Sequence, residues 1–176
     1  HGAFSGILCT GIVGGAVVWK AADAPQVLEF YREFSASAPR ELTSVAVLRI
    51  APPAPWLPKE IHGQPIVAVF ACHSGDPAEA ETAVAPLKSF GAPVADILVR
   101  RPYVQMQSIL DATQPKGRRY YWKSEYLPGL EDGLLAGVVE HAGRVPSPFG
   151  AVILFQIDGA LNDLADDHSP AGNREA

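Results

Sequence analysis

The stretch whose side chains could do the most chemistry is residues 118–126, which read RRYYWKSEY. With the period of two of a β-strand, alternate side chains face opposite sides of the chain. One face of the predicted strand then carries Arg119, Tyr121, Lys123 and Glu125. Because a phenol, an ammonium and a carboxylate would stand in a row, this face suits the lining of a substrate pocket. The same pattern also fits an amphipathic strand whose charged face is only hydrated.

Polar side chains also end the apolar run at residues 149–158, FGAVILFQID. We predict a strand here in which one face carries Val152, Leu154, Gln156 and Asp158. An amide and a carboxylate at the end of an apolar strand are candidate site residues. The alternative is that both side chains lie beyond the edge of the sheet, in solvent.

Three glycines in the first apolar run, Gly11, Gly14 and Gly15, suggest a nucleotide-binding loop. Their spacing is not the G-x-G-x-x-G of such loops, and the following residues 16–19, AVVW, predict a strand and not the start of a helix. A bulge or a close approach of two backbones is therefore the better interpretation.

The cysteines and histidines do not predict a metal site. Cys72 and His73 are adjacent in a predicted strand, so their side chains leave opposite faces and make a poor pair of ligands. Cys9 and Cys72 both lie in apolar runs, which favours buried free thiols over a disulfide framework. His141, near the end of a predicted helix, is interpreted as a capping or surface residue and not as a base.

The elements that must position these residues follow from apolar periodicity and from the turn residues between them. Strands are predicted at 7–19, 43–51, 65–73, 94–101, 118–126 and 149–158. Helical segments are predicted at 24–37, 77–90, 103–112 and 130–143. The proline-rich residues 52–58 are interpreted as a stiff connecting loop, with a PxxP ligand as the alternative.

Two of these strands, 43–51 and 65–73, follow each other without a helix between them, which argues against an all-parallel sheet. We therefore predict an α+β fold, with a single, mostly antiparallel sheet and helices packed on one face. The other face of the sheet is then free to cover a partner or a ligand.

The composition predicts one globular domain over residues 1–176, since 48% of the residues are apolar and 19% are charged. The net charge of −5 and the lack of a basic stripe argue against a nucleic-acid partner. Neither a membrane span nor a signal-peptide pattern is found, so we expect no membrane partner and a cytoplasmic protein. Residues 159–176 are polar, and we expect them to continue into a further segment.

Several short runs together resemble one known family. They are Gly14-Gly15 before a strand that ends in Trp, the helix VLEFYREF, the segment APPAP, Gly-Asp-Pro at 75–77, RYYWKS at 119–124 and SPAGNREA at 169–176. The sequence resembles the substrate domain of FAD-linked oxidoreductases of the berberine bridge enzyme type, within the wider group that has the p-cresol methylhydroxylase-type FAD domain. The resemblance covers nearly the whole chain, and its most specific parts are the Tyr-Tyr-Trp-Lys-Ser run and the Gly-Asn-Arg tail.

This resemblance implies a broad antiparallel sheet that covers the flavin ring and the substrate. The implied partners are a small-molecule substrate and an FAD-binding domain, which is in the same polypeptide or in another. A homo-oligomer is compatible with the resemblance. The implied reaction is oxidation of an alcohol, amine or sugar-like molecule by hydride transfer to flavin. The sequence has no Gly-rich pyrophosphate loop or covalent flavin attachment site, so we expect the chain alone neither to bind FAD tightly nor to turn over.

The resemblance also implies roles for individual residues. Tyr121 would orient or deprotonate a substrate hydroxyl, and Lys123 would lower the tyrosine pKa or stabilise a developing anion or reduced flavin. Asp158 is the candidate base, and Tyr103 and Gln156 are candidate substrate-binding residues. Two other functions stay open: a non-catalytic module that binds a small ligand or a second copy of itself, and a structural or assembly domain.

Overall fold

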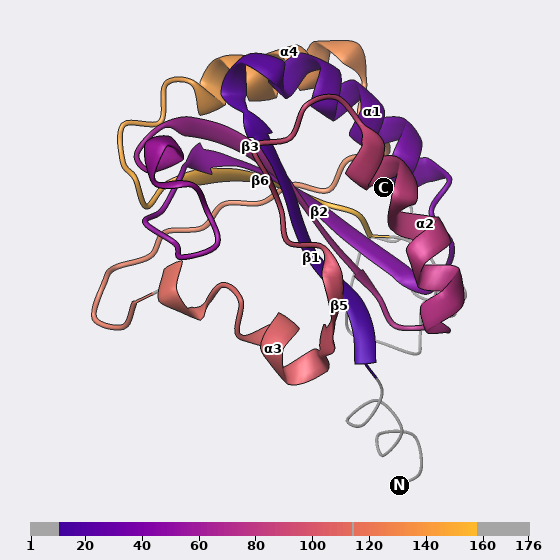
Figure 1. Cartoon of the computed structure of the whole chain (residues 1–176). Helices are drawn as coiled ribbons and strands as arrows, with labels where there is room; N and C mark the ends of the chain where they lie inside the picture. The colour runs from indigo at the N-terminus through magenta and orange to yellow at the C-terminus, as the bar shows by residue number, and fades with distance from the viewer. Residues whose placement is uncertain (1–10, 114, 158–176) are drawn as a thin grey trace, which may run out of the picture.

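The computed structural model of the chain describes residues 11–113 and 115–157, and within them a single six-stranded sheet organises the fold (Figure 1). The strand order is β4-β1-β3-β2-β6, with β5 also paired to β1, and every pairing is antiparallel. The strands are β1 Gly11–Lys20, β2 Leu42–Ile50, β3 Pro65–His73, β4 Ala95–Asp96, β5 Val99–Pro102 and β6 Ala151–Phe155. The α+β class with one antiparallel sheet is thus confirmed.

Three helices cover one face of this sheet: α1 Ala24–Ala36, α2 Pro77–Ser89 and α4 Asp132–Ala142 (Figure 1). The larger hydrophobic core lies between them and the strands, because each helix turns an apolar stripe inward. In α1 this stripe includes Val27, Tyr31 and Phe34, which are buried. The short helix α3, Tyr103–Gln107, lies away from this layer and contacts β1 and β5.

Strict alternation along the strands separates the two faces. In β2, Leu42, Ala46 and Leu48 pack into the helix-covered core, and the side chains at the odd-numbered positions face the other way. We call this other side the open face. The segment between β2 and β3 covers part of it, where Leu57 and Ile61 pack in a second, smaller core. This packing of the proline-rich segment fits the connecting-loop interpretation.

The strand predicted at 118–126 is wrong. These residues form no regular secondary structure, and all nine are exposed. The physical reason is that alternation alone does not make a strand: this run pairs with none of the six strands, so its backbone gains no ladder hydrogen bonds. The strand predicted at 94–101 is divided into β4 and β5, and the helical piece predicted at 103–112 is the short α3 followed by a 3-10 turn, Asp111–Thr113.

The interpretation of the early glycines is confirmed at Gly15, where φ is 152° and an added Cβ would lie 2.0 Å from the carbonyl oxygen of Ile97. We expect Gly15→Ala to lower the free energy of unfolding by about 2–3 kcal/mol, because it combines backbone strain with a clash against another main chain. Urea unfolding measures this.

The matched control for this prediction is Gly137→Ala in α4, where an added Cβ meets nothing within 4 Å. This change should stabilise the chain by about 0.5–1 kcal/mol, since alanine is the better helix former. If Gly15→Ala proves as harmless as the control, the close approach of β1 to Ile97 is contradicted.

Two absences apply to the described part of the chain. No helix in residues 11–113 and 115–157 combines the length and the apolar character that crossing a bilayer requires. The same residues contain no cluster of His, Cys, Asp and Glu that could hold a metal ion. His73 is buried and its Nδ1 accepts a hydrogen bond from the Gly75 N–H at 3.2 Å, whereas Cys72 is a partly buried free thiol. Cys9 lies outside the described residues.

Candidate functional site

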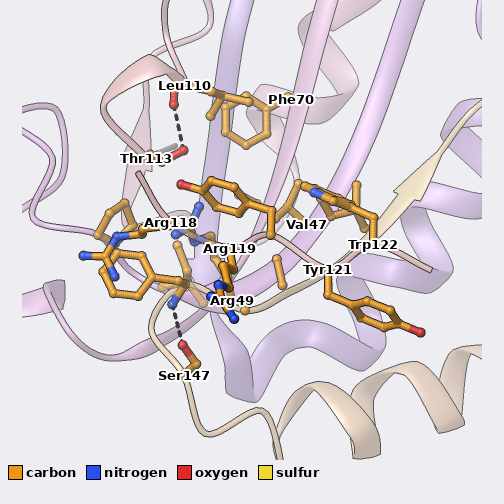
Figure 2. A pocket seen from close by; sticks show the side chains of 18 of the residues that line it. Val47, Arg49, Phe70, Leu110, Thr113, Arg118, Arg119, Tyr121, Trp122 and Ser147 are labelled. Atoms are coloured by element: carbon orange, nitrogen blue, oxygen red, sulfur yellow. Dashed lines mark hydrogen bonds between the residues drawn. The ribbon is translucent and has the colours of Figure 1, made fainter. Parts of the chain in front are cut away.

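A cavity of about 620 Å³ lies on the open face of the sheet (Figure 2). Its floor is a row of side chains across three strands, in which Val47 of β2 pairs with Ala68 of β3 and with Ile153 of β6. The row is continuous because the three strands are antiparallel neighbours and these residues share one parity. The floor is therefore flat and apolar, and it suits one face of a planar ring.

Residues 118–122, which we call the covering loop, lie across this floor. Two contacts hold the loop in place. The Tyr120 hydroxyl donates to the Pro115 carbonyl at 2.8 Å, and the Arg118 guanidinium carbon lies 3.7 Å from the centroid of the Phe149 ring. Trp122 and Tyr121 stay 63% and 89% exposed, so the loop covers the floor without sealing it.

The charged side chains among the described residues that line the cavity are all positive. Three arginines, Arg49, Arg118 and Arg119, are among the described residues that line it, and no Asp or Glu is. This contrasts with the whole chain, in which 19 acidic residues outnumber 14 Lys and Arg. A cavity with three cations and no carboxylate favours a ligand that carries negative charge.

Arg49 is the cation nearest the sheet, because its backbone belongs to β2 and pairs with Ile66 and Ala151. Its Nε donates to the Ile50 carbonyl and its Nη2 to the Pro148 carbonyl, both at 3.2 Å. No ion pair joins it to a carboxylate of the described residues. Burial lowers the pKa of Arg49 because the charged form is partly desolvated.

Among the described candidate catalytic and substrate-binding residues, Tyr121 alone lines the cavity, and Arg119 of the same predicted strand face lines it as well. The Tyr121 ring points away from the other labelled side chains (Figure 2). Lys123 and Tyr103 are exposed and lie outside the lining. Asp158 lies outside the described residues, and its role stays a prediction.

Gln156 is held on the opposite side of the sheet from the cavity. It follows the parity of Val152 and Leu154, whose side chains pack against the helix-covered core. The buried Ser44 hydroxyl donates to Gln156 Oε1 at 2.7 Å, and Gln156 Nε2 donates to the Ser35 carbonyl at 2.8 Å. The prediction that these side chains share a face is therefore confirmed for Val152, Leu154 and Gln156, but that face is not the one with the cavity.

These contacts give Gln156 a measurable part in stability. We expect Gln156→Ala to lower the free energy of unfolding by about 1–3 kcal/mol, because the buried Ser44 hydroxyl loses its acceptor and the Ser35 carbonyl loses one of its donors. The exposed Gln107→Ala in α3 is the control and should change it by less than about 0.5 kcal/mol. Equal, negligible losses in a urea titration would contradict the network.

Sequence reasoning missed Arg49 and Phe149, which line the cavity as a cation and an aromatic wall. A signal for Arg49 was present, because it interrupts the apolar run of residues 45–51, VAVLRIA, at the parity of Val45 and Val47. A partly buried cation in a strand costs free energy unless it has hydrogen-bonding or charged partners.

Comparison with known proteins finds a partial sequence match to an FAD-linked oxidoreductase. No protein-family model matches the chain. Over 112 residues it is 25% identical to an FAD-linked oxidoreductase of Dictyostelium discoideum, an alignment that covers 62% of this chain and 25% of that protein. Among solved structures, 6-hydroxy-D-nicotine oxidase from Arthrobacter nicotinovorans is 17% identical with a TM-score of 0.41, over 62% of this chain and 22% of that one. The chain thus spans about a quarter of the length of its curated relative, and the sequence relationship is to an FAD-linked oxidoreductase.

Proposed function

We propose that this chain is the substrate-covering domain of an FAD-dependent oxidoreductase. The substrate would be an alcohol, amine or sugar-like small molecule, and an FAD-binding domain would come from the same polypeptide or from a partner. The observation that carries the proposal is the position of the cavity, on the sheet face that the helices leave open. The sequence relationship to an FAD-linked oxidoreductase supports the choice of chemistry.

The cavity lining fits one planar ring system better than it fits a whole dinucleotide. Its floor is a flat apolar row, and aromatic side chains such as Trp56 and Phe149 stand around it. Pyrophosphate groups are usually held by backbone N–H groups at helix N-termini or in Gly-rich loops. None of the described lining residues belongs to an α-helix, and only Gly150 among them is a glycine. The dinucleotide part of FAD would therefore be held by the other domain.

In this arrangement a bound flavin supplies the hydride acceptor, and the residues of this chain bind and orient the substrate. Val47 and Ile153 would contact the flat face of a ring and exclude water from it. We place Tyr121 at the rim, where its hydroxyl could orient or deprotonate a substrate hydroxyl. Lys123, Tyr103 and Asp158 keep their proposed roles as anion stabiliser, substrate contact and base. Gln156 is not assigned a substrate contact, because its amide is engaged on the helix side.

The test is to purify the chain together with an FAD-binding domain, encoded in the same polypeptide or co-expressed, and to record the absorbance spectrum. The proposal expects a flavin spectrum that bleaches when a substrate is added without oxygen. A colourless complex, or a flavin that no alcohol, amine or sugar reduces, would contradict it.

A non-catalytic ligand-binding module is the second candidate. The specific observation in its favour is that the floor, walls and charges of the cavity all come from this one chain. Tight ligand binding by a complex that contains no flavin would favour this candidate over the oxidoreductase.

A further inference from the structure

The cavity contains more cationic charge than a covering role requires. Oxidation of a neutral alcohol or sugar needs no cation at the substrate, yet Arg49, Arg118 and Arg119 line the cavity and no carboxylate among the described residues balances them. Placing a guanidinium in a partly buried position costs free energy unless it has a partner of opposite charge. The lining of the cavity therefore offers three cations to a ligand that carries negative charge.

Arg49 is the one of these cations with the most defined geometry. Its Nε and Nη2 donate to the carbonyls of Ile50 and Pro148, which fixes the plane of the guanidinium. A guanidinium has five N–H donors, so most of them remain available. Arg101 Nε is the one buried side-chain donor or acceptor without a partner in the described part of the chain, so Arg49 Nη1, which is not engaged by either carbonyl, is accessible to solvent. Arg49 therefore keeps donors that an anion could reach.

Aromatic side chains line the same cavity as this cation. Trp56 and Trp122 both line the cavity, and the apolar floor runs from Arg49 through Val47 along the same strand. A ligand that fills both parts needs a flat apolar body with a negative charge at one end. The arginine donors are side-chain forks, whose planar geometry matches a carboxylate or a phosphate, and no α-helix N-terminus, which would favour a phosphate, belongs to the lining.

We propose that the cavity binds a planar aromatic molecule that carries a carboxylate, with Arg49 as the residue that pairs with the carboxylate. This rests on the proposed function in so far as the ligand is the substrate of the oxidoreductase. Arg118 and Arg119 are exposed and add long-range attraction, whereas Arg49 gives the directional contact.

The experiment uses the full 176-residue chain and three probes of the same shape: 2-naphthoate, 2-naphthamide and 2-naphthyl phosphate. Binding is followed by NMR through the indole N–H signals of the three tryptophans. Trp56 and Trp122 line the cavity and their signals should shift, whereas Trp19 lies in the helix-covered core and its signal should not. The shifts give both the location and the Kd.

We expect 2-naphthoate to bind about ten- to a hundredfold more tightly than 2-naphthamide, which is the range for a hydrogen bond between charged groups. Arg49→Gln should remove this preference, and Arg49→Lys should keep part of it because the charge remains and the planar fork is lost. The exposed Arg100→Gln on β5, outside the cavity, is the matched control and should keep the full preference. Far-UV circular dichroism checks that each variant is folded.

Four results would overturn the inference: equal Kd values for the acid and the amide, a preference that survives Arg49→Gln, tighter binding of the phosphate than of the carboxylate, or no binding of any probe. None of these results depends on flavin. A flavoprotein that oxidises only uncharged substrates would leave the proposed function in place and contradict this inference. A colourless complex whose cavity still selects the carboxylate through Arg49 would do the reverse.

Discussion

Trp19→Ala is expected to lower the free energy of unfolding by about 3–5 kcal/mol, the range for removing a large aromatic side chain from a core. Trp19 is 1% exposed, and its indole N–H donates to the Phe90 carbonyl at 3.0 Å. The substitution leaves a cavity between β1 and the end of α2 and also removes a hydrogen-bond donor. Domains of this kind are stable by only about 5–15 kcal/mol, so the loss is a large share of the total.

The effect should be large because Trp19 connects three elements. Its ring meets Phe90 edge to face, with centroids 6.3 Å apart, and Phe90 stacks on Phe30 of α1 with centroids 4.2 Å apart. Gly91, the next residue, has a φ of 60°. An added Cβ there would lie 3.6 Å from the indole nitrogen, in ordinary van der Waals contact. The sheet, α1 and the end of α2 are thus connected through Trp19 and Phe90.

The control for this prediction is Trp122→Ala, a substitution of the same size in the covering loop. Trp122 is 63% exposed, and the change should alter the free energy of unfolding by less than about 0.5 kcal/mol. Urea unfolding followed by far-UV circular dichroism measures both variants, since this signal does not depend on tryptophan fluorescence. Similar losses in the two variants would contradict the assignment of one tryptophan to the core and the other to the cavity.

Much of the fold could be predicted because the local patterns are strong. The strand predicted at 65–73 coincides with β3, and the helix at 77–90 ends within one residue of α2, because Pro77 and Gly91 mark its limits. The antiparallel sheet followed from the lack of a helix between β2 and β3. Each of these predictions depends only on residues that are close together in the sequence, so the sequence pattern is enough to make it.

The site could be predicted only in part, because it depends on contacts between distant segments. Period two correctly placed Gln156 with Val152 and Leu154, but no local pattern tells which face the helices cover. Residues 118–126 alternate like a strand, yet they pair with no strand of the sheet. The cavity forms where residues 47–70, the covering loop and residues 147–153 meet. Which strand residues stand side by side in its floor is set by the register between β2, β3 and β6, which the sequence does not show.

The covering loop should be needed for catalysis and not for folding. In the complex with an FAD-binding domain, we expect a Gly-Ser sequence in place of residues 118–122 to reduce substrate oxidation on the order of 10²-fold, the scale for losing the alignment of a bound reactant. All five residues are exposed, so the free energy of unfolding should change by less than about 1 kcal/mol. The measurements are kcat/KM, flavin content from the absorbance spectrum, and urea unfolding.

A Gly-Ser sequence in place of residues 124–128 is the matched control, because these five residues are equally exposed and none of them lines the cavity. It should keep oxidation within a few-fold of the unchanged protein. The contrast separates two explanations, since general loosening of this long loop would lower the rate in both variants, whereas loss of the cavity wall would lower it in one. Full activity with residues 118–122 replaced would show that the substrate does not bind beneath the covering loop, and the open face would then have to act through some other part of its surface.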